Sequence, residues 1–184
     1  MRIIGGRAGG RRLTVPPTGT RPTSDRVREA LFSALEARGA IEDATVLDLF
    51  AGSGSLGLEA LSRGASTTVL VERDPRACAV LSTNAREVGT GALVRRAAVA
   101  TYLRGRAHTA FDLVFVDPPY SDPVDDVLAA LAGGWLADGA LVVVERDTRS
   151  PAPTWPGGLV AEEPRAYGET TLHLAVSTPA STPV

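Results

Sequence analysis

Three short segments combine residue types that can bind a small charged ligand and act on it. In the first, Asp48 precedes three glycines, Gly52, Gly54 and Gly57. Glycines at this spacing, between a strand and a helix, let the backbone turn sharply and approach a ligand closely. A carboxylate beside the turn suits a ligand with an ammonium group and repels a pyrophosphate. The segment therefore favours S-adenosylmethionine over a nicotinamide dinucleotide. The predicted cofactor contacts here are Asp48, Phe50, Gly52 and Gly54.

The second segment begins with Glu72, which ends a predicted strand and lies 24 residues after Asp48. An acid at this place accepts hydrogen bonds from the ribose hydroxyls of an adenosine cofactor. Because NAD and S-adenosylmethionine both carry these hydroxyls, Glu72 does not separate the two. Arg73 follows directly, and Ala98 lies after the next strand, where the adenine is expected. Both residues are included in the predicted cofactor site.

The third segment, Asp117, Pro118, Pro119 and Tyr120, follows an apolar run and carries the strongest signal. An amino group on an aromatic base is a poor nucleophile because its lone pair is delocalised into the ring. Hydrogen-bond acceptors help by favouring a pyramidal nitrogen as a methyl group arrives. The Asp117 carboxylate and the Pro118 carbonyl are such acceptors, two prolines stiffen the loop, and Tyr120 offers a face for stacking. These four residues are predicted to be catalytic.

The acid at position 117 also predicts which base is modified. An ionised Asp only accepts hydrogen bonds, whereas Asn both accepts and donates. Guanine presents two adjacent donors, its ring N1–H and its 2-amino group, while adenine presents a donor beside an acceptor. Asp117 therefore favours N2 of guanine over N6 of adenine as the methylated atom.

Charge is distributed unevenly along the chain. Residues 1–40 hold eight Arg and three acids, which gives +5, and the remainder holds eleven Arg and eighteen acids, which gives −7; together they recover the formal charge of −2. A basic segment on an acidic body indicates a polyanionic partner. Arginine suits bidentate contacts with phosphate, although the total absence of Lys is better explained by genome base composition than by function. The predicted RNA contacts are Arg2, Arg7, Arg11, Arg12, Arg21 and Arg26.

Strands and helices are predicted to alternate, which indicates an α/β fold with a mostly parallel sheet and helices on both faces. Predicted strands cover residues 45–49, 67–72, 93–95, 111–116 and 140–145; predicted helices cover residues 24–38, 56–63, 75–88 and 124–131. Residues 159–161 and 170–176, joined by a turn near Gly168, are predicted to close the sheet as an antiparallel hairpin. Residues 1–22 are expected to form a basic hairpin arm and connector, 23–176 the catalytic domain, and 177–184 a disordered tail.

The chain resembles the bacterial 16S ribosomal RNA guanine-N2 methyltransferases of the RsmD type over nearly all of residues 1–176. The motifs that carry the resemblance are RIIGG at residues 2–6, RPTSDRVRE at 21–29, DLFAGSG at 48–54, GLEALSR at 57–63 and VDPPY at 116–120. The resemblance implies a Rossmann-like, seven-stranded, S-adenosylmethionine-dependent methyltransferase that modifies one guanine of 16S rRNA during assembly of the small ribosomal subunit. Alanines at positions 97 and 98 depart from the polar residue expected against the adenine.

Other interpretations stay open at this point. An NAD-dependent oxidoreductase would fit the glycines and Glu72, but it leaves residues 117–120 unexplained. An amino methyltransferase of DNA or of a protein glutamine uses similar loops, although DNA enzymes usually add a recognition domain. An RNA-binding module without turnover is a weaker alternative, because all three loops carry complete chemistry.

Several classes of protein are disfavoured. The longest apolar runs, such as residues 113–116 and 141–144, are far too short to cross a membrane. Residues 2–20 have no signal-peptide character, and the lone Cys78 cannot form an internal disulfide, so a cytoplasmic protein is expected. Cys78 is predicted to pack in the core. His108 and His173 show no metal-ligand spacing, and no metal site is predicted.

Overall fold

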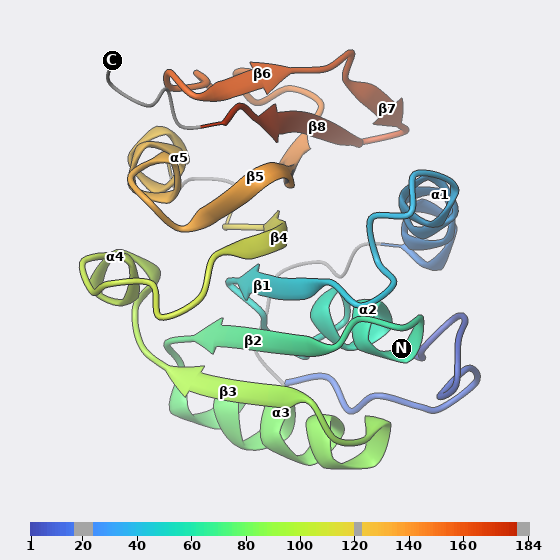
Figure 1. Ribbon diagram of the computed structural model, residues 1–184. Coiled ribbons are helices and arrows are strands. Elements are labelled where there is room, and N and C mark those ends of the chain that lie inside the picture. Colours follow the sequence, from blue (N-terminus) through green and yellow to red (C-terminus); the bar gives the residue numbers. More distant parts are fainter. Residues whose placement is uncertain (17–23, 120–122, 180–184) are drawn as a thin grey trace.

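Strands that alternate with helices form one mixed sheet in the computed structural model, which describes residues 1–16, 24–119 and 123–179 (Figure 1). The strands are β1 (Thr45–Leu49), β2 (Thr67–Glu72), β3 (Ala92–Arg96), β4 (Phe111–Val116), β5 (Leu136–Asp147), β6 (Leu159–Ala161), β7 (Arg165–Tyr167) and β8 (Thr170–Ser177). The helices are α1 (Asp25–Ala37), α2 (Gly57–Ser62), α3 (Pro75–Val88), α4 (Val99–Leu103) and α5 (Asp125–Ala132). The predicted bounds of β1, β2 and β4 are confirmed to the residue.

The sheet has the order β3-β2-β1-β4-β5-β8-β6. β3, β2, β1, β4 and β5 are parallel, and β8 runs antiparallel to β5. From β1 the chain first adds strands on one side and later, with β4, on the other. This reversal between β1 and β4 is the point at which open α/β sheets bind ligands, beyond the carboxyl ends of the strands.

The closing hairpin differs in detail from the prediction. β6 pairs with β8 as expected, but the turn at Gly168 joins β8 to β7. β6 and β7 pair with opposite ends of the same edge of β8, so eight strands occupy seven positions. The sequence of β7, Arg165–Tyr167, is short and has no buried residue, so no alternation of polar and apolar residues announces it.

Both faces of the sheet are covered, and strand residues alternate between them. On one face, Val46 and Phe115 pack with α1, where the rings of Phe32 and Phe115 lie 5.7 Å apart. On the other face, Leu47 and Val114 pack with α4 and α5. Because both faces are buried, β1 and β4 are almost continuous apolar runs, as expected for interior parallel strands. Cys78 is buried in α3, as predicted.

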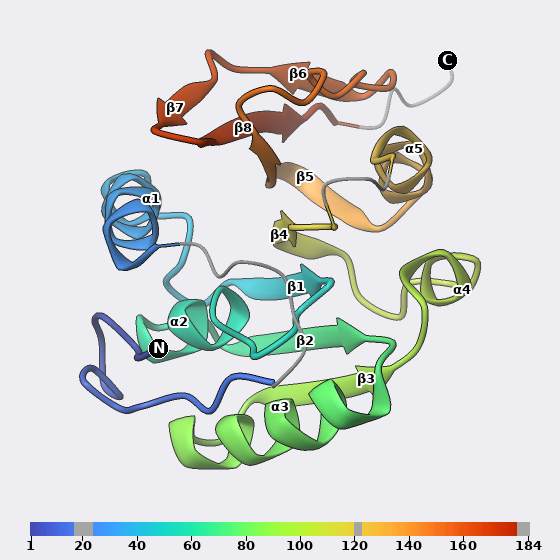
Figure 2. The same ribbon diagram turned by 180° about the vertical axis from the view of Figure 1, so that it is seen from behind.

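Residues 1–16, called the N-terminal arm below, form the predicted hairpin but are not separate from the body. Arg2 and Arg12 form an antiparallel bridge, and the Ile3 amide donates to the Arg11 carbonyl at 2.9 Å. Ile3 and Leu13 are buried in one cluster with Leu58, Leu61 and Leu81 of α2 and α3. Figure 2 shows the arm running beside these two helices. Sequence analysis did not predict this packing, because Ile3 and Leu13 lie in short apolar runs among Arg and Gly.

Three smaller differences have local causes. α4 was not predicted, because five residues without a side-chain cap give little helical signal. β5 begins four residues early, across an irregular register with β4. Ser177 was predicted to begin a tail but ends β8, where its hydroxyl accepts from the Ala140 amide at 2.8 Å and donates to the Ala137 carbonyl at 2.6 Å. Among the helices described, none combines the length and the apolar character needed to cross a membrane.

Candidate functional site

A cavity of about 520 Å³ opens beyond the carboxyl ends of β1, β2 and β4. It lies beside the reversal of strand order between β1 and β4, where open α/β sheets bind ligands. Most of the predicted site residues line it, namely Phe50, Gly52, Glu72, Arg73, Ala98, Asp117 and Pro119. Asp48, Gly54 and Pro118 are buried and do not line it, and Tyr120 lies outside the described residues. Pockets of this size commonly hold small-molecule cofactors.

The first wall is the glycine loop, residues 50–56 between β1 and α2. Its backbone is left-handed at Phe50 (φ 64°), Gly52 (φ 55°) and Gly54 (φ 84°). A Cβ at Gly54 would lie 2.6 Å from Leu81 Cδ1, so this position also lacks space for a side chain. Phe50 is not a glycine, and a left-handed bulky residue costs conformational energy that the surrounding structure must offset. Such strain is typical of a loop shaped for a ligand.

Asp48 supports the glycine loop from beneath. The residue is 2% exposed, and its carboxylate accepts a hydrogen bond from the Gly57 amide at 2.8 Å. Burial raises the pKa of Asp48 to about 7, against the lowering effect of the Gly57 hydrogen bond. The predicted contact between Asp48 and the ammonium group of a cofactor stays a prediction. In the structure, Asp48 links β1 to the first residue of α2.

The second wall is held by Glu72 at the end of β2. One carboxylate oxygen accepts from the Gly52 amide at 3.0 Å, and the other accepts from the Asp74 amide at 2.8 Å. Each oxygen retains a second acceptor position, which a ribose hydroxyl can use. Asp74 caps α3 by accepting from the Arg76 and Ala77 amides. The capped helix thus fixes the turn that carries Glu72 and Arg73.

Asp117 directly follows β4 and lines the cavity. The residue is half-buried, because the cavity leaves it partly accessible. Burial raises the pKa of Asp117 well above its usual range, and the carboxylates of Glu145 and Asp48 raise it further, whereas Arg146 lowers it. The neighbouring strands explain these effects, because the residues before Asp117 and Glu145 are paired across β4 and β5. Perturbed carboxylates in a cleft are typical of functional sites.

The predicted RNA contacts are on the surface where they are described. Arg2, Arg7, Arg11, Arg12 and Arg26 are exposed, and Arg21 lies outside the described residues. Arg7 donates to the Thr90 carbonyl at 3.3 Å and Arg11 donates to the Glu87 carbonyl, so the arm arginines extend across the end of α3.

Sequence reasoning missed the buried polar residues behind the arm. Arg28 was counted in the basic segment of residues 1–40, but its side chain is completely buried. Glu59 and Asn84 are also buried and were not singled out. A signal existed for Glu59, which interrupts the otherwise apolar run of α2. The arm also reaches the cavity, which Met1, Val15 and Pro16 line.

Comparisons with known proteins agree with this architecture. The family described as Conserved hypothetical protein 95 matches residues 1–176. The chain is 40% identical over 178 residues to ribosomal RNA small subunit methyltransferase D of Escherichia coli strain K12, covering 95% of this chain and 88% of that protein. A solved putative methyltransferase from Escherichia coli superposes with a TM-score of 0.88 at 39% identity, covering 98% and 99% of the two chains.

A more distant structure shares only the fold. It is an RNA methyltransferase from Salinibacter ruber in complex with S-adenosyl-L-homocysteine, with a TM-score of 0.65 at 19% identity, covering 88% of this chain and 97% of that one. The fold predicted from the sequence, a Rossmann-like arrangement with a closing antiparallel hairpin, is confirmed.

Proposed function

Because the chain belongs to the family described as Conserved hypothetical protein 95, that of ribosomal RNA small subunit methyltransferase D, we propose that it methylates N2 of a guanine in 16S rRNA. Membership of this family supports the assignment as a ribosomal RNA methyltransferase, and the fold supports S-adenosylmethionine as the methyl donor. The choice of guanine N2 depends on one observation, the carboxylate of Asp117 in the cavity at the end of β4.

The residues present fit S-adenosylmethionine. The glycine loop turns left-handed at three positions, and Phe50 and Gly52 of this loop line the cavity. Glu72 is fixed by two amides at the place expected for the ribose hydroxyls. Apolar surface for the adenine comes from Ala97, Ala98 and Val99, beside the cavity. When bound, the sulfonium supplies an electrophilic methyl carbon.

Asp117 and the Pro118 carbonyl would act on the nucleophile. Both accept hydrogen bonds, and guanine offers N–H donors at N1 and at the 2-amino group. In the transfer, the N2 lone pair forms a bond to the methyl carbon while the carbon–sulfur bond breaks, and sulfur retains that electron pair. N2 then loses one proton to Asp117 or to water, which leaves neutral N2-methylguanine and S-adenosylhomocysteine.

The raised pKa of Asp117 fits this role. Acceptance of two N–H donors requires the ionised carboxylate, and hydrogen bonds to the charged form lower a carboxyl pKa. A bound guanine would therefore stabilise the charge that burial and the neighbouring carboxylates disfavour in the free protein. A base that places an acceptor opposite Asp117, as adenine does, would not stabilise that charge. The buried setting thus increases the discrimination between the two bases.

The exposed arginines of the arm suggest how the RNA is held. Arg2, Arg7, Arg11 and Arg12 lie on the arm, whose ends at Met1 and Pro16 line the cavity. Arginine contacts to phosphate position an RNA without reading its sequence. We therefore infer that the arm contacts 16S rRNA, within an assembling small ribosomal subunit, close to the nucleotide that enters the cavity.

The test is methylation with S-adenosylmethionine labelled in its methyl group, with unmethylated small subunits and naked 16S rRNA as substrates. The labelled nucleoside is identified by chromatography, and N2-methylguanosine is the expected product. Label in another nucleoside would retain the methyltransferase and overturn the guanine assignment. Label only in the protein of the small subunits, or no label in either substrate despite cofactor binding, would overturn the RNA substrate. Binding of NAD in place of S-adenosylmethionine would overturn the reaction class.

The variant Asp117→Asn tests the carboxylate itself. It keeps the shape of the side chain but presents a donor to one of the two guanine N–H groups. Guanine methylation should fall by roughly a hundredfold or more, because one acceptor of the transition state becomes a donor. Binding of S-adenosylhomocysteine should be retained, which separates loss of chemistry from loss of the fold. Undiminished methylation of guanine by Asp117→Asn would overturn the role of Asp117.

A further inference from the structure

We propose that Arg28 and Asn84 are positioning residues that couple the N-terminal arm to the glycine loop of the cofactor site. The inference rests on the proposed function, because it requires the glycine loop to bind the cofactor. Each of the two side chains contacts the backbone of the arm and the backbone of the glycine loop at the same time. Their contacts join two segments that lie far apart in the sequence.

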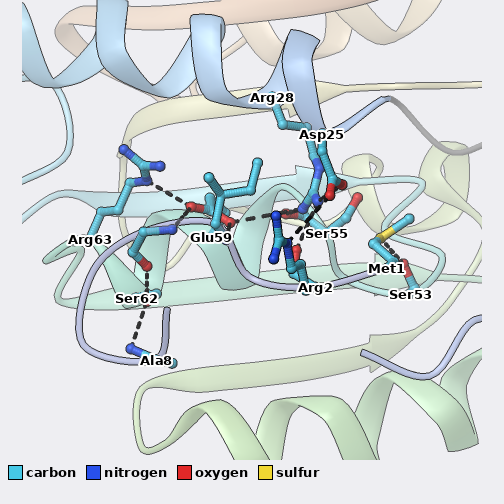
Figure 3. A network of polar contacts seen from close by, with 12 residues as sticks. Met1, Arg2, Ala8, Asp25, Arg28, Ser53, Ser55, Glu59, Ser62 and Arg63 are labelled. Carbon is cyan, nitrogen blue, oxygen red and sulfur yellow. Dashed lines mark hydrogen bonds and ion pairs between the residues drawn. The ribbon is translucent and has the colours of Figure 1, made fainter. Parts of the chain in front are cut away.

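Arg28 connects the glycine loop to the first limb of the arm, the limb that contains Arg2 and Ile3. Its side chain extends from α1 and is completely buried. One guanidinium nitrogen, Nη2, donates to the Arg2 carbonyl of the arm at 2.8 Å, and the other, Nη1, donates to the Ser55 carbonyl of the glycine loop at 3.3 Å (Figure 3). The planar guanidinium fixes the relative direction of its donors, so it sets the spacing of both carbonyls.

Carboxylates balance the charge of Arg28 and extend the connection. Asp25 lies 2.7 Å from Nη2 of Arg28, and the fully buried Glu59 lies 3.8 Å from Nη1. Glu59 in turn accepts from the arm amides of Ile4 at 2.7 Å and Gly5 at 2.8 Å. Because a buried ion pair is stable only when its charges and hydrogen bonds are satisfied, displacement of the arm would be costly here.

Asn84 connects the glycine loop to the second limb of the arm, the limb that contains Leu13 and Thr14. This residue of α3 is 1% exposed. Its Oδ1 accepts from the Thr14 amide at 3.0 Å, and its Nδ2 donates to the Thr14 carbonyl at 2.9 Å and to the Ser53 carbonyl of the glycine loop at 2.9 Å. A single amide group therefore holds the arm at Thr14 and the loop at Ser53, two residues before the carbonyl that Arg28 holds.

The two connections imply that the cofactor and the RNA affect each other's binding. A ligand that orders the glycine loop also orders Ser53 and Ser55, and through Asn84 and Arg28 it orders both limbs of the arm. The arm carries exposed arginines, so an RNA bound there orders the loop by the same contacts. Such coupling is reciprocal, and its usual size is between about fivefold and about 150-fold in affinity.

Hydrogen exchange of the full chain, with and without S-adenosylhomocysteine, tests the coupling without any RNA. The reporters are the Ile3 amide, which donates to the Arg11 carbonyl, and the Leu13 amide, which donates to the Met1 carbonyl. Both bonds lie within the arm and involve neither Arg28 nor Asn84. Saturating S-adenosylhomocysteine should slow exchange at both amides by about fivefold or more in the native protein.

Two variants separate the limbs. In Asn84→Ala the slowing at Leu13 should be lost, and in Arg28→Lys, which keeps the charge, the slowing at Ile3 should be lost. Both variants should still bind S-adenosylhomocysteine. Thr83→Ala is the matched control, because this exposed neighbour of Asn84 bonds the Ala79 carbonyl within its own helix, and the native slowing should persist. Should Asn84→Ala fail to fold, the result with Arg28→Lys alone decides whether the arm is coupled to the glycine loop.

The outcomes distinguish the inference from the proposed function. Unchanged slowing in both variants, or no slowing of arm amides in the native protein despite cofactor binding, would overturn the coupling and leave the methyltransferase intact. Failure of the native protein to bind S-adenosylhomocysteine would overturn the proposed function and the coupling with it. As a second measurement, 16S rRNA should tighten S-adenosylhomocysteine binding to the native protein but not to Asn84→Ala.

Discussion

The Asp48 carboxylate accepts a hydrogen bond from the Gly57 amide at 2.8 Å, within a buried contact between β1 and α2. The glycine loop runs between these two residues. A Cβ at Gly57 would lie 3.0 Å from Asp48 Cβ, so α2 approaches the sheet more closely here than a side chain permits. The bond and the close approach together set the distance that the glycine loop must span.

Gly57→Ala should therefore destabilise the protein and distort the cofactor site. The added methyl group would lie 2.4 Å from Leu70 Cδ2 and 2.7 Å from Thr68 Cγ2, both on β2. Overpacking of this kind costs about 1–3 kcal/mol. Urea unfolding measures the loss, and calorimetry should show weaker binding of S-adenosylhomocysteine. Gly157→Ala is the control, because nothing lies within 4 Å of the added Cβ. Equal stability of the two variants would contradict the packing argument.

The pKa of Asp48, raised to about 7, predicts how stability varies with pH. The raised pKa favours folding while the carboxyl is protonated, and this contribution is lost as the pH rises from the unfolded value near 3.8 through about 7. Asp48→Asn keeps an oxygen acceptor for Gly57 and removes the titration. Relative to this variant, the native free energy of unfolding should fall by roughly 2–3 kcal/mol between about pH 5 and about pH 8.

Denaturant unfolding at several pH values measures the difference. Asp112→Asn is the matched control, because Asp112 is exposed and also accepts a backbone amide bond, from Thr45 at 2.8 Å. That variant should follow the native pH dependence. A native protein whose stability, relative to Asp48→Asn, rises with pH over this window would show that Asp48 is charged at little cost.

The sequence predicts the place of a residue well when the signal lies in the residue's own strand or motif, and poorly when its partners lie far along the chain. Asp48 is the next-to-last residue of β1, Glu72 ends β2 and Asp117 follows β4, so alternation and motif spacing were enough to place all three at one edge of the sheet. Arg28 and Asn84 could not be placed in the same way. Their partners are backbone groups far along the chain, and nothing in a polar residue's own neighbourhood says that it will be buried.

The arm shows the same limit on a larger scale. Its hairpin follows from local glycines and was predicted, whereas its packing on α2 and α3 depends on Ile3 and Leu13 meeting a distant cluster. The charge pattern gave the exposure of Arg12 correctly, but it gave no hint that Arg28, in the same basic segment, is completely buried. Charge alone therefore overestimated the number of arginines available to RNA.

Arg12→Ala should weaken binding of 16S rRNA uniformly across RNA sequences. Arg12 is exposed on the arm, and a phosphate contact releases a counterion on binding. The slope of log affinity against log salt should become shallower by roughly 0.7–0.9. Filter binding over a range of salt concentrations measures it. Arg149→Ala, which removes an exposed arginine after β5, should leave the slope unchanged. An identical loss in both variants would show that the arm has no special role.

The pH dependence of methyl transfer should report the ionisation of Asp117. The transfer requires the carboxylate, so kcat/KM should fall as the pH decreases through the raised pKa of Asp117. Asp48 raises that pKa and Arg146 lowers it. Asp48→Asn should therefore shift the acid limb of the profile to lower pH, because a smaller penalty opposes ionisation. Arg146→Gln should shift the limb to higher pH, because a stabilising charge is lost.

Measurement of kcat/KM for both variants against pH, with saturating S-adenosylmethionine and limiting rRNA, tests the two opposite shifts. Each variant serves as the control for the other, since general damage to the site would lower the plateau without moving the limb in opposite directions. Melting curves at each pH would exclude unfolding as the cause. Shifts in the same direction, or a limb that neither substitution moves, would mean that a group other than Asp117 controls the ionisation that methyl transfer requires.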